Sequence, residues 1–232
     1  MSIAANLALI RERIAAAARR AGRSSDDVAL MAVTKTFSAE VIREAHAAGL
    51  RLFGENRVQE FAGKAEAVRA LAGARWHLIG HLQSNKAARA AELFDAVDTV
   101  DSLRLARKLN TAAEERGIPL PVLIEINLGD EAAKSGAAPD SKELEDILYA
   151  APQLEALKIS GLMAIPPFTP DPDDARPYFR RLRELHHEIA ARKLPAVTMS
   201  VLSMGMTHDF EVAIEEGSTC VRLGAAIFGA RA

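Results

Sequence analysis

Short apolar runs alternate with longer amphipathic stretches along this chain of 232 residues. The stretches between the runs, for example 102–116 and 173–192, carry apolar residues at the spacing of an amphipathic helix. The runs themselves predict eight strands, at residues 30–34, 51–54, 75–80, 96–100, 122–127, 159–164, 198–201 and 219–223. Strands that alternate with helices predict the α/β class and a parallel sheet. We expect a single (β/α)8 barrel of the TIM type, with an open doubly wound sheet as the alternative.

The first residues predict an extra helix that precedes the barrel. Ile3, Leu7, Ile10 and Ile14 lie on one helical face, and the helix is expected to end near Gly22. We therefore expect residues 1–22 to pack as an N-terminal helix on one domain that spans residues 1–232. Charged residues on the other faces interrupt the apolar sequence that a signal peptide would need, and no run of eighteen apolar residues predicts a membrane span.

Composition narrows the classes of partner and compartment. Hydrophobic residues make up 49% of the chain, the formal charge is -2, and no long basic tract predicts nucleic-acid binding. The single cysteine, Cys220, cannot form an internal disulfide, so a reducing, cytoplasmic setting is expected with Cys220 as a small buried residue. No spacing of histidine, cysteine and carboxylate residues predicts a metal site.

Polar and small residues follow several predicted strands, at the ends where TIM-type barrels carry functional groups. Lys35 follows the first strand, as a Schiff-base lysine would, although a solvated or ion-paired lysine is the ordinary alternative. Segment 203–207 and Gly224 follow strands seven and eight and predict an anion cradle or, equally, a simple turn. With Arg222 between them, these groups suit a phosphorylated aldehyde. A phosphosugar enzyme with Glu125 as its base is a further alternative.

Eight motifs along the chain resemble those of the pyridoxal phosphate homeostasis protein family. In chain order they are AVTKTF, FGENRVQE, WHLIGHLQSNK, VDSL, EINLGDEAAKSG, GLMAI, LSMGMTHDFEVAIEEGST and VRLGAAIFG. Together they run from Ala32 to Gly229 and cover nearly the whole chain. The resemblance implies a barrel similar to the N-terminal domain of alanine racemase and to the fold-type III enzymes that use pyridoxal 5'-phosphate (PLP).

The resemblance also implies which residues bind PLP. Lys35 matches the lysine that holds PLP as a Schiff base, and Arg222 matches the arginine that faces the pyridine nitrogen. An arginine there disfavours a protonated pyridine and weakens PLP as an electron sink. The remaining cofactor residues implied are Asn56, His77, Met163, Ser203, Met204, Gly205 and Gly224, of which Ser203, Met204, Gly205 and Gly224 belong to the phosphate cup.

The expected role is intracellular PLP homeostasis without substantial catalytic turnover, so no residue is assigned as catalytic. Two-base racemisation needs a second acid or base, which alanine racemases take from a tyrosine of a separate domain. The chain ends at Ala232, so we expect that domain to be missing, and Tyr149 and Tyr178 lie on predicted helices. A racemase of low activity remains the alternative. The expected state is a monomer, with PLP-dependent apo-enzymes as possible recipients of PLP.

Overall fold

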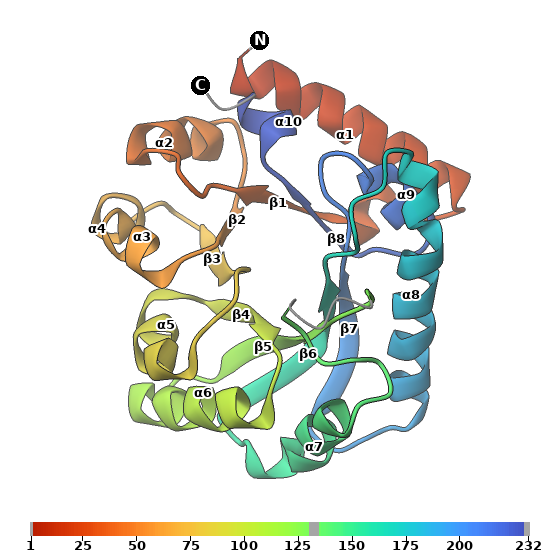
Figure 1. Ribbon diagram of the computed structural model, residues 1–232. Helices are drawn as coiled ribbons and strands as arrows, with labels where there is room; N and C mark the ends of the chain where they lie inside the picture. The colour runs from red at the N-terminus through yellow and green to blue at the C-terminus, as the bar shows by residue number, and fades with distance from the viewer. Residues whose placement is uncertain (1, 130–134, 230–232) are drawn as a thin grey trace.

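The computed structural model describes residues 2–129 and 135–229, and its strands form a closed barrel (Figure 1). All strand pairs are parallel, and β1 pairs with both β2 and β8, which closes the sheet. The strands are β1 (Ala29–Val33), β2 (Leu52–Glu55), β3 (Arg75–Leu78), β4 (Ala96–Val100), β5 (Leu120–Ile126), β6 (Leu157–Ala164), β7 (Val197–Ser203) and β8 (Cys220–Leu223). The prediction of a (β/α)8 barrel is confirmed, and the open sheet is wrong.

Helices surround this barrel and connect its strands (Figure 1). The α-helices are α1 (Ile3–Arg20), α2 (Ala39–Ala47), α3 (Val58–Ala62), α4 (Ala65–Val68), α5 (Ala87–Leu93), α6 (Leu103–Arg116), α7 (Lys142–Ala150), α8 (Arg176–Ala191), α9 (Phe210–Glu215) and α10 (Ala225–Phe228). Short 3-10 turns are η1 (Ser25–Asp27), η2 (Ser84–Lys86), η3 (Ala151–Gln153) and η4 (Pro172–Ala175). Serine caps begin several helices: the side chain of Ser102 accepts a hydrogen bond from the amide of Leu105.

Helix α1 confirms the expected N-terminal helix and lies against α9 and α10 (Figure 1). Its apolar face is buried, as the spacing of Ile3, Leu7, Ile10 and Ile14 predicts. The side chain of Asn6 donates to the carbonyl of Ile227 at 2.8 Å, so the start of the described chain is tied to its last helix.

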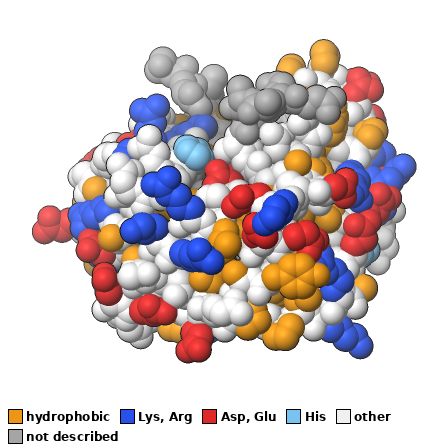
Figure 2. All heavy atoms as spheres, turned by 60° about the horizontal axis from the view of Figure 1, so that its bottom comes forward, with side chains coloured by type: hydrophobic (Ala, Val, Ile, Leu, Met, Phe, Trp, Pro, Cys, Tyr) orange, Lys and Arg blue, Asp and Glu red, His pale blue; other side chains and the backbone are white. Residues whose placement is uncertain are grey.

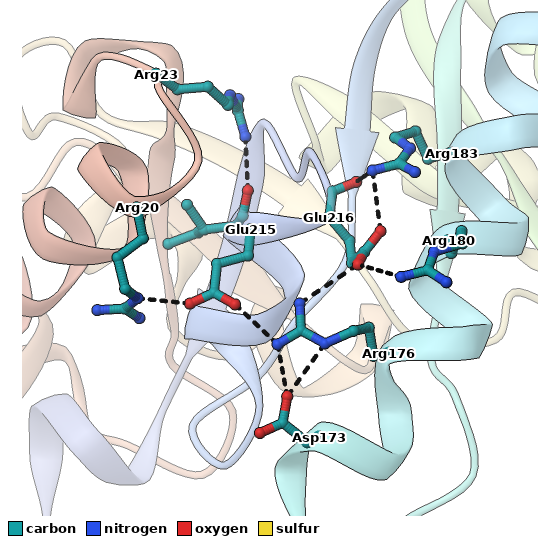
Figure 3. Close-up of polar contacts among 9 residues, drawn as sticks. Arg20, Arg23, Asp173, Arg176, Arg180, Arg183, Glu215 and Glu216 are labelled. Atoms are coloured by element: carbon teal, nitrogen blue, oxygen red, sulfur yellow. Dashed lines mark hydrogen bonds and ion pairs between the residues drawn. The ribbon is translucent and has the colours of Figure 1, made fainter.

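A cluster of ion pairs joins α1, α8 and the end of α9 (Figure 3). Glu215 accepts from Arg20 and from Arg176, which lie on different helices. Glu216 is 5% exposed, and three arginines of α8 converge on its carboxylate, namely Arg176, Arg180 and Arg183. Burial is the largest single influence on the pKa of Glu216 and raises it. The arginines and their hydrogen bonds together outweigh burial, so the pKa of Glu216 is lowered.

The interior of the barrel has its own small apolar cluster, separate from the main core between strands and helices. Met31, Val33, Ile79 and Cys220 form this cluster. Burial raises the pKa of the Cys220 thiol to about 12, so Cys220 is the inert buried residue that composition predicts. Because apolar side chains fill the middle of the barrel, polar groups at its two ends form separate sites.

The outer surface on the side of α6 and α7 carries charges of both signs (Figure 2). A hollow of about 530 Å³ between these helices is lined by Arg104, Arg107, Lys108, Thr111, Glu143 and Asp146, together with Leu103. This mixture produces no field of a single sign there. Across the described part of the chain, no helix is both long enough and apolar enough to cross a membrane.

Candidate functional site

Lys35 lies on a strained turn at the carboxyl end of β1. The lysine is half-buried, and the next residue, Thr36, has a φ of +68°. A β-branched residue in the left-handed region costs about 1–3 kcal/mol, so surrounding contacts must hold it there. The amide of Thr36 donates to Oε1 of Glu60 at 2.5 Å. The position of Lys35 is therefore set by contacts with another element and not by the local sequence alone.

A second lysine, Lys64, stabilises this turn through hydrogen bonds to its backbone. Its Nζ donates to the carbonyl of Thr34 at 3.0 Å and to the carbonyl of Phe37 at 3.3 Å, one on each side of Lys35. The same Nζ lies 2.9 Å from Oε1 of Glu55, whose side chain is fully buried. Thr34 donates its hydroxyl to that oxygen at 2.5 Å. This buried ion pair fixes the backbone that presents Lys35.

The buried carboxylate of Glu55 is only partly satisfied. Burial raises its pKa, and the hydrogen bond from Thr34 and the charge of Lys64 oppose that rise. Its Oε2 has no hydrogen-bond partner within residues 2–129 and 135–229. Glu55 directly follows the predicted strand at residues 51–54, but the sequence pattern does not identify Lys64. The available signal was the spacing of four residues between Glu60 on α3 and Lys64 in the turn after it, and such a spacing is too common to be informative.

Arg222 lies inside the barrel on β8 and is 3% exposed. Its guanidinium donates to Oγ of Ser203 at 2.7 Å and to the carbonyl of Ala164 at 2.8 Å. Burial lowers its pKa, yet an arginine keeps its proton in proteins near neutral pH. Arg222 therefore joins the ends of β6, β7 and β8 and presents a fixed positive charge to the interior.

Gly205 and Gly224 give the backbone the shape of an anion cradle. Gly205 has a φ of +93°, and a Cβ at this position would lie 2.5 Å from the Cβ of Ala213. Its carbonyl accepts the amide of Arg222 at 3.0 Å, which ties this loop to β8. In the part of the chain that the structure describes, the amides of Gly205 and Gly224 have no hydrogen-bond acceptor. Two such donors at adjacent strand ends suit a phosphate.

Other predicted residues lie around this group. Asn56 is half-buried directly after β2, and Met163 is fully buried beside Ser203 in the register of β6 and β7. Met204 is also buried, but it packs in the core between strands and helices. Met204 therefore offers the site its backbone only.

His77 is the predicted cofactor residue that the structure places elsewhere. Its Nδ1 lies 3.0 Å from Oδ1 of Asp98, and both residues line a cavity near the amino ends of the strands. Burial is the largest single influence on the pKa of His77 and lowers it. The charge of Asp98 and its hydrogen bond to His77 act against burial, and the net effect is a raised pKa. This position lends no support to a role for His77 in cofactor binding.

Glu125 is a buried carboxyl group near the site that the predicted cofactor set left out. Its Oε1 accepts the hydroxyl of Ser135 at 2.9 Å, while Oε2 has no partner among the described residues. Burial raises its pKa, so it holds its proton to a higher pH than an exposed glutamate. Lys134, in the same sequence motif, lies outside the described residues. No cluster of three metal-binding side chains occurs in the ranges that the structure describes.

The arrangement combines a half-buried amine, a fixed arginine and a backbone cradle at one end of the barrel. An amine can condense with an aldehyde, and amide donors can hold a phosphate. The site therefore suits a small ligand that carries both groups.

Comparison with protein families and curated relatives gives matches along the whole chain. Residues 5–232 match the family model described as the N-terminal domain of alanine racemase. A protein of Aquifex aeolicus is 43% identical over 231 residues, which cover 100% of this chain and 99% of the relative. One of Escherichia coli K12 is 46% identical over 231 residues, with 99% and 97% covered. Both relatives are named pyridoxal phosphate homeostasis protein.

Solved structures with the same fold include a PLP-bound protein. PipY of Synechococcus elongatus, solved with PLP bound, superposes with a TM-score of 0.85 at 36% identity and covers 98% of this chain and 100% of its own. A protein of Bifidobacterium adolescentis gives 0.87 at 39% identity, with 97% and 94% covered. Alanine racemase of Streptomyces coelicolor, at 22% identity and a TM-score of 0.70 over 97% of this chain and 59% of its own, shares the fold.

Proposed function

The chain belongs to the family of the alanine racemase N-terminal domain, and we propose that it binds PLP and serves PLP homeostasis. Near-full-length relatives that carry this function in their name, and the PLP-bound structure of PipY, support the proposal. The observation in this chain that carries it is the joint placement of Lys35, Arg222 and the glycine cradle at one end of the barrel.

The residues present fit PLP. The amine of Lys35 would form a Schiff base with the aldehyde, and Ser203, Gly205 and Gly224 would hold the phosphate. When bound, PLP supplies an electrophilic aldehyde and a ring that can accept electrons. Arg222 would face the ring nitrogen, and because it does not give up a proton, it favours the unprotonated pyridine and weak electron withdrawal. Asn56 and Met163 would line the site beside the ring.

We propose binding rather than turnover because a second acid or base has no clear candidate among the tyrosines. Tyr149 lies on α7 with 65% of its surface exposed, and Tyr178 lies on α8. Glu125, with its raised pKa and an oxygen that has no partner among the described residues, is the observation that favours weak racemase activity. We further propose that the protein is a cytoplasmic monomer that passes PLP to apo-enzymes.

The absorbance spectrum of the PLP-loaded protein tests the proposal. Lys35→Ala should lose the Schiff-base absorbance while the circular dichroism spectrum stays unchanged. Lys86→Ala is the matched control, because Lys86 lies on η2 after β3 and is also half-buried. Added amino acids should be neither racemised nor transaminated. A Schiff-base band that survives in Lys35→Ala would refute the assigned lysine, and saturable turnover would favour the racemase.

A further inference from the structure

A second cavity, of about 390 Å³, lies at the end of the barrel where the strands begin. It is lined by η1 and by residues at or near the starts of the strands, among them Ala29, Leu52, Ala96 and Thr219. Its volume lies within the range of small-molecule sites, about 300–1,000 Å³. The interior cluster around Met31 and Val33 stands between this cavity and Lys35.

Small side chains create this space. Ala29, Ala96, Ser160, Ser200 and Thr219 line the cavity. Interior layers of such barrels are usually filled by bulky branched side chains, so small residues on five different segments leave room that packing alone would not favour. The apolar walls of the cavity are formed by larger side chains such as those of Met31, Leu52 and Leu123.

Asp98 lines the cavity, and its carboxylate accepts fewer hydrogen bonds from the described residues than it could. It is 1% exposed, and its two oxygens share a single donor, Nδ1 of His77, at 3.0 and 3.2 Å. A carboxylate has about four lone-pair positions, and a buried one is costly unless they are used. Within the described ranges Asp98 has no other hydrogen-bond donor. A donor supplied from the cavity would fill this deficit.

The charges around the cavity select the sign of the ligand. Asp26 and Asp27 of η1 line it together with Asp98 and its partner His77, and no lysine or arginine occurs among the described lining residues. Two arginines act on this pair from outside the lining: Arg75 on His77, where Asp95 offsets it, and Arg222 on Asp98. The lining therefore favours a cation over an anion.

We infer that this cavity binds a small organic cation, with its N–H group on Asp98 and its apolar body against Met31, Leu52 and Leu123. Three independent features support this assignment: the space, the underused buried carboxylate and the absence of lysine and arginine from the described lining. The site is separate from the proposed PLP site and does not rest on the proposed function.

Calorimetric titration of the purified full-length protein with three probes of similar size tests the inference. The cation is N,N-dimethylbenzylamine, a tertiary amine that cannot form a Schiff base with PLP. The neutral probe is N,N-dimethylbenzamide, and the anion is phenylacetate. The cation should bind with a Kd of roughly 0.1–1 mM, within the limits for a ligand of this size. The neutral probe should bind at least about tenfold more weakly and the anion undetectably, because only the cation can pair with Asp98.

Two variants locate the binding. Ala96→Leu fills the cavity and should abolish binding of both the cation and the neutral probe. Asp98→Asn keeps the shape of the cavity. It should weaken binding of the cation at least about tenfold and leave binding of the neutral probe unchanged. Asp146→Asn, a carboxylate in the hollow between α6 and α7, is the matched control and should change nothing. Circular dichroism confirms that each variant is folded.

The inference is overturned by any of three results. The first is no binding of the cation at about 10 mM, well above the expected Kd. The second is equal affinity for all three probes. The third is unchanged binding of the cation by folded Ala96→Leu protein, and this result decides the matter even if Asp98→Asn fails to fold.

Discussion

Replacement of Lys64 by methionine should separate the stability of the barrel from the positioning of Lys35. Lys64 is 11% exposed, and its ammonium contacts the fully buried Glu55 and the carbonyls of Thr34 and Phe37. Methionine keeps much of the length of the side chain and removes the charge. The variant therefore leaves a buried carboxylate without its cation and leaves the turn around Lys35 without its anchor.

The size of the effect follows from the burial of Glu55. Removal of one partner of a buried ion pair costs about 3–5 kcal/mol. We expect about 3 kcal/mol at pH 7.5, because Glu55 can take up a proton instead of staying charged. The loss of Lys64 raises the pKa of Glu55 further in the folded state, so the folded variant binds more protons than the unfolded chain above pH ~4.5. The variant is therefore stabilised as the pH falls, and the cost should decrease to about 1 kcal/mol at pH 5.5.

Urea denaturation of the apo protein at both pH values measures this cost. Lys142→Met is the matched control, since Lys142 is 85% exposed in its pair with Asp146 and should cost less than about 0.5 kcal/mol. A second substitution, Glu55→Gln, in the Lys64→Met background removes the unpaired charge and should recover about 2 kcal/mol.

Affinity for PLP should respond differently from stability in these variants. Lys64→Met should weaken PLP binding by about tenfold, because the turn that presents Lys35 loses its anchor. The double variant with Glu55→Gln should recover stability but not affinity, since the carbonyls around Lys35 still lack their donor. If Lys64→Met were as stable as the wild type, or if Glu55→Gln restored affinity together with stability, the reasoning would be refuted.

Three further substitutions test the rest of the site and its support. Gly205→Ala should lower the free energy of unfolding by about 3 kcal/mol in urea denaturation and weaken PLP binding, because alanine is strained at a positive φ and its Cβ would lie 2.5 Å from the Cβ of Ala213. Gly22→Ala is the control: Gly22 also has a positive φ but open space around it, so the cost should be only about 1 kcal/mol. Glu125→Gln should stabilise the apo protein by about 1 kcal/mol at pH 8 and should have no effect near pH 4.5, because the raised pKa of Glu125 makes its charged form destabilise the folded protein only as the pH rises. An equal gain at both pH values would contradict this. Glu216→Gln should lower the free energy of unfolding at pH 7 by about 2 kcal/mol, since three arginines of α8 lose their shared carboxylate, and wild-type stability would count against the cluster.

Alternation of apolar runs with helical stretches predicted a parallel sheet and favoured the barrel, with an open doubly wound sheet as the alternative. The same reasoning put Lys35, Ser203, Arg222 and Gly224 into one site, because the carboxyl ends of parallel strands meet at one end of a closed sheet. Strand limits were less accurate: β7 extends over Val197–Ser203, beyond the predicted 198–201, because pairing with β6 includes Val197 and continues through Leu202 and Ser203.

The contacts that support the site could not be predicted in this way. Lys64 reaches Thr34 across 30 residues of sequence, and Arg222 reaches Ala164 across 58. Such pairs depend on the register between strands and on how helices sit over them, and neither is encoded by local spacing. For the same reason Lys64 resembles an ordinary helical lysine in the sequence.

The position of His77 illustrates the same limit of prediction from sequence. The period of two along a strand predicts that alternate residues face the interior, but it does not say at which height in the barrel each side chain lies. The register places His77 beside Asp98, at the end of the barrel opposite to Lys35. The sequence by itself determined the architecture and the end of the barrel that carries the amine and the anion cradle. Only the tertiary structure decided the height of each side chain and its partners, because closure of the barrel sets both.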